Sequence, residues 1–364
     1  MSHKSGIYII AEAGVNHNGS LDTAVRMVDV AADSGANAVK FQTFKAERII
    51  SRKAPKADYQ TQHTDPAESQ LEMVKKLELD FDAHQVLIKR CQEKDIDFLS
   101  TPFDMESIDI LVRGLNVSQL KIASGEISNG PLLLKAARSG KPIILSTGMS
   151  SLDDVEKALK VLAFGYIANG EMPSLDAFQK AYDSEAGHHT LRAKVILLHC
   201  TTEYPAPFDE VNLLAMDTLK SHFDLRVGFS DHTPGIAVPI AAAARGAKVI
   251  EKHFTLDRHL PGPDHQASLE PQELKQMVEA IRQVEQAIGY PSKEPTASEL
   301  KNLPIARKSL VAAQAIQQGE VFTEQNITAK RPGNGFSPMF YWSLLGKIAA
   351  RDYSIDEMIT DQPI

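Results

Sequence analysis

The sequence predicts an α/β protein built as a (β/α)8 TIM barrel and followed by a small C-terminal module. Short runs rich in β-branched residues alternate eight times with amphipathic stretches, which indicates a parallel sheet. Eight such units within residues 7–289 are typical of a closed barrel. A doubly wound open sheet is the alternative, and it is weakened because no G-x-G-x-x-G motif follows the first strand.

Each predicted unit consists of one strand and the helix that follows it. The predicted strands are Ile7–Glu12, Ala36–Phe41, Asp97–Thr101, Ser118–Ala123, Pro142–Thr147, Lys194–His199, Leu225–Ser230 and Ala247–Lys252. The predicted helices are Leu21–Ser34, Phe81–Lys94, Met105–Arg113, Pro131–Ser139, Leu152–Ala163, Asp209–His222, Gly235–Arg245 and Pro271–Gly289.

Local signals support these helices. Ser20 can cap the first helix, and Asp22 places a negative charge in its first turn. The apolar positions on one face of that helix are Ala24, Met27, Val28, Ala31 and Ala32. In the seventh unit, Pro234 and Gly235 open an Ala-rich helix that Gly246 closes.

Two segments interrupt the alternation within the barrel. Residues 43–80 form a long connection after the second strand, and long loops at this face often cover a substrate. Residues 165–192 are a polar insertion, which we interpret as a peripheral decoration. We expect its paired His188 and His189 to lie in a solvated loop rather than in a metal site.

The pattern changes again after Gly289. Residues 290–307 read as a polar linker, so we expect a barrel domain over 1–289 and a separate module over 308–364. In that module, Arg331 stands at the base of a Gly-rich loop. This loop is either an ordinary turn without a function of its own or a loop that brings Arg331 to an anionic ligand.

The composition restricts the class of protein. The formal net charge is -8 and no basic run occurs, so we expect no nucleic-acid partner. Only Cys91 and Cys200 are present, which favours a reducing compartment over a disulfide scaffold. The first residues lack the apolar core of a signal peptide, and no apolar run is long enough to span a membrane. We therefore expect a cytoplasmic protein without a membrane partner.

Polar side chains gather at the predicted carboxyl ends of the strands, where the active site of a barrel lies. His232 and His253 follow two successive strands and could share a divalent metal such as Mn2+, Fe2+, Co2+ or Zn2+; the alternative is a pair of hydrogen-bonded loop residues. A second group suits a phosphate and a carboxylate, unless its lysines form structural ion pairs; it consists of Lys40, Lys121, Ser124, Ser146 and Ser230. The carboxylates left for hydroxyl contacts and proton transfer are Glu12, Glu126 and Asp264.

Twelve stretches of the chain match one known family of enzymes: IIAEAGVNHNGS, AVKFQTFKAE, APKADYQ, SQLEM, FLSTPFD, LKIASGE, ILSTGM, LHCTTEYP, GFSDHTPG, EKHFTLD, GPDHQASLEP and ITAKRPGNGFSP. Through them the chain resembles bacterial N-acetylneuraminate (sialic acid) synthases and their relatives for legionaminic and pseudaminic acids. The stretches occur in order over residues 7–358, and together they are highly specific. The resemblance implies a barrel followed by an antifreeze-like (SAF) domain.

The resemblance also implies a reaction and a set of site residues. In it, phosphoenolpyruvate and water condense with N-acetylmannosamine to give N-acetylneuraminate, and phosphate leaves by C–O cleavage. His232 and His253 are the implied ligands of a divalent metal, Mn2+ first, with Mg2+ or Co2+ possible. The implied phosphoenolpyruvate contacts are Lys40, Lys121, Ser124, Ser146, Thr202 and Ser230. The implied sugar contacts are Glu12, Gln42, Glu126, Tyr204, Asp264 and Arg331, the last lent by the partner subunit of a domain-swapped homodimer.

Several alternatives stay open at this point. We expect Glu12, Lys121, Glu126 and Asp264 to be catalytic, but the sequence does not choose the general acid or base. The acceptor could instead be 2,4-diacetamido-2,4,6-trideoxymannose, which would give N,N'-diacetyllegionaminate. More distant alternatives are a class I aldolase with a Schiff base on Lys121 and a non-catalytic sugar-binding subunit.

Overall fold

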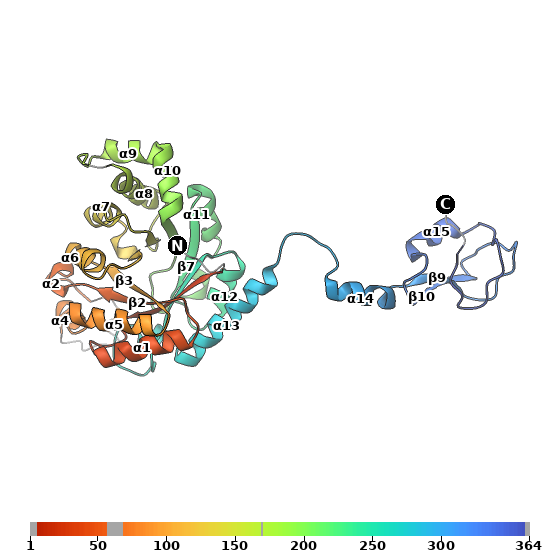
Figure 1. The fold of residues 1–364 in the computed structure, drawn as a ribbon, viewed down its shortest axis with the longest axis horizontal. Coiled ribbons are helices and arrows are strands. Elements are labelled where there is room, and N and C mark those ends of the chain that lie inside the picture. Colours follow the sequence, from red (N-terminus) through yellow and green to blue (C-terminus); the bar gives the residue numbers. More distant parts are fainter. Residues whose placement is uncertain (1–5, 57–67, 169, 361–364) are drawn as a thin grey trace. The chain divides into compact units, whose positions relative to one another are not determined.

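The computed structural model describes residues 6–56, 68–168 and 170–360, and Figure 1 labels many of their helices and strands. The chain divides into two compact units, of which the first ends at Gly289 and the second begins at Tyr290. Each unit has a hydrophobic core of its own, the first centred on the helix–sheet interface and the second on a small antiparallel sheet.

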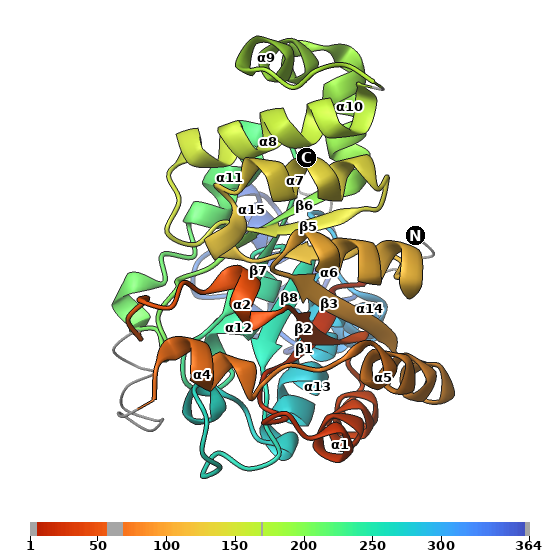
Figure 2. The same ribbon diagram turned by 90° about the vertical axis from the view of Figure 1, so that its left-hand side faces the viewer.

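All strands of the first unit are parallel and belong to one eight-stranded sheet. They are β1 (Tyr8–Gly14), β2 (Ala38–Thr43), β3 (Asp97–Pro102), β4 (Leu120–Ile122), β5 (Ile143–Ser146), β6 (Val195–His199), β7 (Arg226–Asp231) and β8 (Val249–His253). Their order is β3-β2-β1-β8-β7-β6-β5-β4, and the two end strands β3 and β4 also lie beside each other. The sheet therefore curls into a near-closed barrel, which confirms the predicted fold (Figure 2).

The helices that connect the strands lie outside the sheet (Figure 2). They include α1 (Leu21–Asp33), α5 (Phe81–Glu93), α6 (Met105–Asp109), α7 (Gly130–Arg138), α8 (Leu152–Ile167), α11 (Ala215–Phe223), α12 (Ala237–Ala244) and α13 (Pro271–Ile288). Ser20 does cap α1, since its side chain accepts a hydrogen bond from the backbone N–H of Thr23. The predicted start of α11 at Asp209 is wrong, because Asn212 adopts a positive φ of 47° and interrupts the helix.

The polar insertion of residues 165–192 is a helical pair rather than a loop. Helix α8 continues to Ile167, and α9 (Leu175–Asp183) and α10 (Glu185–Lys194) follow. Ser174 and Ser184 each cap one of these helices, and the Phe178 ring meets Phe164 of α8 edge to face at 5.1 Å. His188 and His189 are exposed, as expected, but they lie on α10.

The connection after β2 carries two short helices, α2 (Ala46–Ile49) and α4 (Gln70–Lys75). Ser69 and Glu72 form a capping box that sets the start of α4. Most of the APKADYQ motif lies outside the described residues.

The side chains inside the barrel change from apolar to charged along its axis, toward the carboxyl ends of the strands. An apolar layer lies within the sheet and consists of Ile10, Ala38, Leu99, Ile144, Ile196, Leu198 and Val249. Side chains two positions further along a strand point to the same face, so Glu12, Lys40 and Glu251 follow Ile10, Ala38 and Val249 toward the carboxyl ends. Glu12 pairs in register with Lys40 on one side and with His253 on the other.

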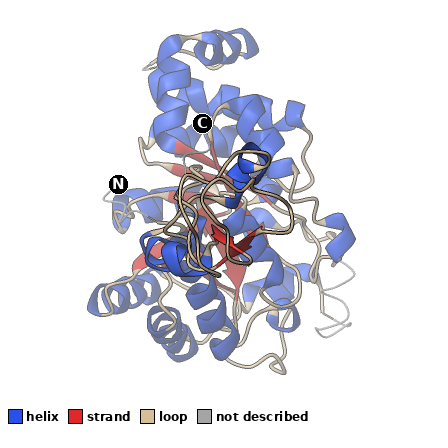
Figure 3. Ribbon diagram, turned by 90° about the vertical axis from the view of Figure 1, so that its right-hand side faces the viewer, coloured by secondary structure: helices blue, strands red, loops and turns tan. Residues whose placement is uncertain are grey.

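The second unit is small, and most of it is loop, drawn in tan in Figure 3. Its elements are α14 (Ala297–Ala306), β9 (Ser309–Ala312), β10 (Ile327–Lys330), the turn η5 (Pro338–Phe340) and α15 (Tyr341–Leu344). Strands β9 and β10 are antiparallel. The segment expected to be a linker contains α14, which begins at a capping box of Thr296 and Glu299.

None of the helices in the described part of the chain is long and apolar enough to cross a membrane.

Candidate active site at the carboxyl end of the barrel

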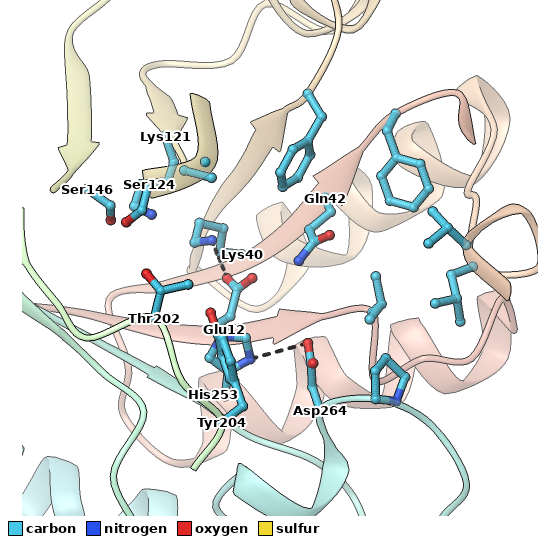
Figure 4. Close-up of a pocket in the computed structure, with 18 of the residues that line it drawn as sticks. Glu12, Lys40, Gln42, Lys121, Ser124, Ser146, Thr202, Tyr204, His253 and Asp264 are labelled. Atoms are coloured by element: carbon cyan, nitrogen blue, oxygen red, sulfur yellow. Dashed lines mark ion pairs between the residues drawn. The ribbon is translucent and has the colours of Figure 1, made fainter. Parts of the chain in front are cut away.

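A cavity of about 340 Å3 lies at the carboxyl ends of the strands (Figure 4). It gathers most of the residues that the sequence assigned to a site. Those that line it are Glu12, Lys40, Gln42, Lys121, Ser124, Ser146, Thr202, Tyr204, Ser230, His232, His253 and Asp264. They come from strands far apart in the sequence, and parallel pairing brings their ends together.

One predicted site residue of the barrel does not line the cavity, and another belongs to the second unit. Glu126 is not among the described residues that line the cavity, and its Oε2 accepts a hydrogen bond of 2.7 Å from Asn129 Nδ2. Asn129 is the N-cap of α7, so this contact ties Glu126 to the start of that helix. Arg331 is an exposed residue of the second unit, and its Nε donates to the carbonyl of Ala306 at 3.1 Å.

Four charged side chains form a buried cluster at the floor of the cavity. Lys40 Nζ lies 2.6 Å from Glu12 Oε2 and 3.6 Å from Glu251 Oε2. Lys121 Nζ lies 3.2 Å from Glu251 Oε1. Each of these four residues is at most 3% exposed, so the charges act on one another with little screening by water.

Glu251 belongs to the charged cluster and lines the cavity, although the sequence analysis does not select it. It lies two positions before His253 on β8, so both side chains point into the barrel. The alternation of side chains along the strand is the signal that points to Glu251, although Glu251 lies inside the predicted strand Ala247–Lys252 and not at its end. Its Oε1 also accepts a hydrogen bond of 2.8 Å from Ser230 Oγ.

The cluster perturbs its own ionisation. Burial raises the pKa of Glu12 to about 7, although Lys40 opposes this. Burial alone would also raise the pKa of Glu251, but Lys121 and then Lys40 outweigh it and lower that pKa to about 2. Burial opposes the charge on Lys40, yet Glu12 and Glu251 raise its pKa. When Glu12 carries a proton, the cluster has two cations and one anion and can receive an anionic ligand.

Several hydroxyl groups lie beside the charged cluster, and not all of them are hydrogen-bonded in the described part of the chain. Ser146 Oγ and Thr202 Oγ1 are buried and have no hydrogen-bond partner within the described ranges. A buried polar atom without a partner costs about 1–3 kcal/mol, so a ligand that supplies the missing bond is favoured. Ser124 Oγ accepts a hydrogen bond of 2.9 Å from the backbone N–H of Gly148. Figure 4 shows Lys121, Ser124 and Ser146 together on one side of the cavity.

Gly148 allows these hydroxyls to come together. A Cβ atom on this residue would lie 2.3 Å from Thr202 Oγ1 and 2.8 Å from Ser124 Oγ. Both distances are far below van der Waals contact, so any larger side chain would push the hydroxyls apart. This explains why the ILSTGM stretch carries glycine two residues after the end of β5.

His232 and His253 face each other across 5.4 Å between ring centroids. His232 Nδ1 lies 2.6 Å from the carbonyl of Thr201, so this nitrogen donates and Nε2 keeps its lone pair. Burial lowers the pKa of His232 to about 4 and lowers that of His253 well below its usual value. Both imidazoles are therefore neutral near pH 7, the form that binds metal.

The histidine pair fits a metal with open coordination positions. His253 Nδ1 is buried without a hydrogen-bond partner in the described part of the chain. No group of three or more His, Cys, Asp or Glu side chains there could hold an ion, so the pair would leave the remaining positions to water or ligand oxygens. Asp264 Oδ2 lies 3.9 Å from His253 Nδ1, and burial raises the pKa of Asp264 to about 6.

Comparisons with known proteins match most of the chain. A protein-family model described as "NeuB family" matches residues 27–293 of the chain, and a second one, described as "SAF domain", matches residues 307–363. The chain is 54% identical over 353 residues to the N,N'-diacetyllegionaminic acid synthase of Campylobacter jejuni, covering 97% of this chain and 98% of that protein. It is 42% identical over 339 residues to the protein of the same name from Legionella pneumophila, covering 93% and 89%.

Solved structures share the fold. The crystal structure of N-acetylneuraminic acid (sialic acid) synthetase from Leptospira borgpetersenii serovar Hardjo-bovis, in complex with citrate, is similar with a TM-score of 0.66 and 36% identity. The match covers 82% of this chain and 90% of that one.

Proposed function

This chain belongs to the NeuB family, and we propose that it condenses phosphoenolpyruvate with 2,4-diacetamido-2,4,6-trideoxymannose and water to give N,N'-diacetyllegionaminate and phosphate. The sequence alone ranked N-acetylmannosamine first. The two N,N'-diacetyllegionaminic acid synthases that align over nearly the whole chain favour the other acceptor, so we reverse that ranking. The observation that carries the proposal is one cavity that holds an anion-binding cluster and a pair of neutral histidines.

We assign phosphoenolpyruvate to the side of the cavity that carries Lys121. The ammonium groups of Lys40 and Lys121 would hold its phosphate and carboxylate. The hydroxyls of Ser124, Ser146, Thr202 and Ser230 would complete the contacts. Two of them, on Ser146 and Thr202, are buried and have no hydrogen-bond partner elsewhere in the described ranges. Holding both charged ends leaves C3 of phosphoenolpyruvate facing the middle of the cavity, where the aldehyde carbon must come.

We assign a divalent metal, Mn2+ first and Mg2+ or Co2+ as alternatives, to His232 and His253. When bound, the metal would polarise the aldehyde oxygen of the open-chain sugar. The carbonyl of Thr201 orients His232 for this role. Tyr204, whose ring centroid lies 4.2 Å from that of His232, packs against the imidazole and limits its movement.

Asp264 and Glu12 are the carboxyls placed to move protons. Bond formation between C3 and the aldehyde carbon produces an alkoxide that must take up a proton. Water then adds at C2 and loses a proton, and the C–O bond to phosphate breaks. Both carboxyls line the cavity and have pKa values raised by burial, to about 7 for Glu12 and about 6 for Asp264, as acid–base catalysis near neutral pH requires. We do not assign Glu126 this role, since it contacts Asn129 instead.

The test is phosphate release from phosphoenolpyruvate in the presence of Mn2+ with each of three acceptors. These are N-acetylmannosamine, 2,4-diacetamido-2,4,6-trideoxymannose and unsubstituted mannose. We expect the diacetamido sugar to give the highest kcat/KM and mannose the lowest. No phosphate release with any acceptor contradicts the proposed reaction, and borohydride trapping of pyruvate on Lys121 would point to the aldolase alternative.

We also propose that Arg331 completes the sugar site of a second copy in a domain-swapped homodimer. The test mixes two inactive variants, Lys121→Met and Arg331→Ala, after dissociation and reassembly. If Arg331 acts between subunits, mixed dimers contain one intact site and recover part of the activity. If each arginine serves its own chain, mixed dimers contain no intact site and activity stays absent.

A further inference from the structure

One wall of the cavity is apolar, although every substrate of the proposed reaction is rich in oxygen. This wall is formed by the connection after β2 and by the end of β3. The side chains that define it here as the apolar wall are Phe44, Ile49, Met73, Val74, Leu77 and Phe103.

The apolar wall is a packed surface with its own small core. Phe44 and Leu77 are buried in a cluster against which Ile49, Val74 and Phe103 pack. The rings of Phe44 and Phe103 meet edge to face, with centroids 6.2 Å apart and an interplanar angle of 83°. The capping box described above sets the start of α4, the helix that supplies Met73 and Val74.

The apolar wall lies away from the phosphate-binding residues. In Figure 4, Gln42 and Asp264 lie on the side of the cavity opposite Lys121, Ser124 and Ser146, and unlabelled aromatic and aliphatic side chains lie beyond Gln42. The aldehyde carbon of the acceptor must meet phosphoenolpyruvate near the middle of the cavity. The far end of the sugar, with C4 to C6, then extends toward the apolar wall.

We propose that the apolar wall selects the acceptor by receiving the C6 methyl group and an acetamido methyl group of a 6-deoxy sugar. This inference rests on the proposed function and explains its choice of substrate. A sugar with a hydroxyl group on C6 would bury that group against carbon and lose its bonds to water. Hydrophobic pockets of this kind discriminate against an added hydroxyl by about 100-fold.

The first experiment compares kcat/KM of the wild-type enzyme for 2,4-diacetamido-2,4,6-trideoxymannose and for its 6-hydroxy analogue, 2,4-diacetamido-2,4-dideoxymannose. The two differ only by the hydroxyl on C6. We expect the 6-deoxy sugar to be favoured by about 100-fold. Equal kcat/KM for both, with phosphate released, would overturn the role of the apolar wall and leave the proposed function standing. No phosphate from either sugar, nor from N-acetylmannosamine, would overturn the proposed function itself.

The second experiment adds one hydroxyl to the apolar wall through Val74→Thr, which keeps the shape of the side chain. We expect kcat/KM for the 6-deoxy sugar to fall about tenfold while the KM for phosphoenolpyruvate is unchanged and the preference over the 6-hydroxy analogue narrows. Met73→Gln, which is also close in shape, should act in the same direction. An equal fall for both sugars would show that the apolar wall is only structural.

The matched control is Val30→Thr, at a half-buried valine of α1 that packs against the main core and does not line the cavity. It carries the same chemical change outside the site. We expect it to lower the midpoint of thermal unfolding about as much as Val74→Thr and to leave the ratio of kcat/KM values for the two sugars unchanged. A narrowed ratio in this control would assign the effect to stability and contradict the proposal.

Discussion

Strand β8 contributes to two buried lysine–carboxylate pairs, one on each face of the sheet. Outside the barrel, Lys252 Nζ lies 2.5 Å from Asp231 Oδ2 and donates to the carbonyl of Thr233, and both charged residues are fully buried. Inside, Lys121 reaches across from β4 to Glu251 at 3.2 Å. The residue types are the same, and neighbouring positions on β8, Glu251 and Lys252, belong to different pairs.

The two pairs differ in how many of the polar atoms around them have hydrogen-bond partners. Asp231 also accepts from the backbone N–H and the hydroxyl of Thr233, so each charged group of the outer pair has at least two hydrogen-bond partners. The inner pair borders a cavity in which the side-chain oxygens of Ser146 and Thr202 have no hydrogen-bond partner among the residues that the structure describes. A satisfied buried pair supports a structure, whereas an incompletely satisfied one is prepared for a ligand. Four predictions test this difference, in order of expected size.

Lys252→Met should give the largest effect, and that effect should be on stability. Removing the lysine leaves the Asp231 carboxylate buried without a cation, which costs about 3–5 kcal/mol of unfolding free energy. Denaturant unfolding measures this loss, and kcat/KM of the folded fraction should change little. The double variant Lys252→Met/Asp231→Asn should recover much of the stability, because no charge is then left alone. A large loss of kcat/KM with normal stability would contradict the structural role.

Lys121→Met should have the reverse effect. Loss of a charged donor from a preorganised site lowers the rate about 100- to 1,000-fold. The unfolding free energy should change less than in Lys252→Met, since Glu251 keeps Lys40 and Ser230 as partners. Steady-state kinetics and unfolding of the same preparations provide the comparison. Equal destabilisation by the two variants would remove the distinction between the pairs.

Acidification should lower the unfolding free energy because His232, inside the barrel, is held neutral. His232 has a pKa of about 4 in the folded protein and an ordinary value near 6.5 in the unfolded chain. Between pH 6.5 and 4 the unfolded chain therefore binds a proton that the folded protein does not, and the unfolding free energy falls as the pH falls. The unfolding free energy is therefore lower at the acidic end of this range by on the order of 3 kcal/mol.

This pH dependence can be measured by thermal unfolding in the presence of a chelator. His232→Gln keeps a donor for the carbonyl of Thr201 but does not titrate, so its stability should depend less on pH over the same range. Parallel pH curves for the variant and the wild type would show that His232 is not held neutral by the fold.

Glu251→Gln should give the smallest effect, which is a change in the affinity of the enzyme for inorganic phosphate. The change removes one negative charge beside both lysines, so inorganic phosphate should inhibit about tenfold more strongly, or about 1.4 kcal/mol. The double variant Lys252→Met/Asp231→Asn, which leaves no unpaired charge on the outer face, is the control and should leave this inhibition unchanged. Weaker binding of phosphate to Glu251→Gln would mean that Glu251 mainly orients Lys121 rather than balancing its charge.

Much of the fold and part of the site could be predicted because the signals are local. Alternating strands and helices predicted the barrel, and Ser20 capped its helix as expected. Residues at strand ends, such as Lys40, Lys121, His232 and His253, could be collected into one site because parallel strands end on the same side. This step needs only the order of the elements along the chain.

The tertiary structure alone decided which candidates meet and what surrounds them. It brought Glu251 between two lysines, turned Glu126 toward Asn129, and folded α4 against the end of β3 to make the apolar wall. These outcomes depend on cross-strand register and side-chain direction, where a shift of one residue reverses the face that a side chain occupies. The sequence therefore determined the chemical groups at the mouth of the barrel, and packing determined which of them share a cavity.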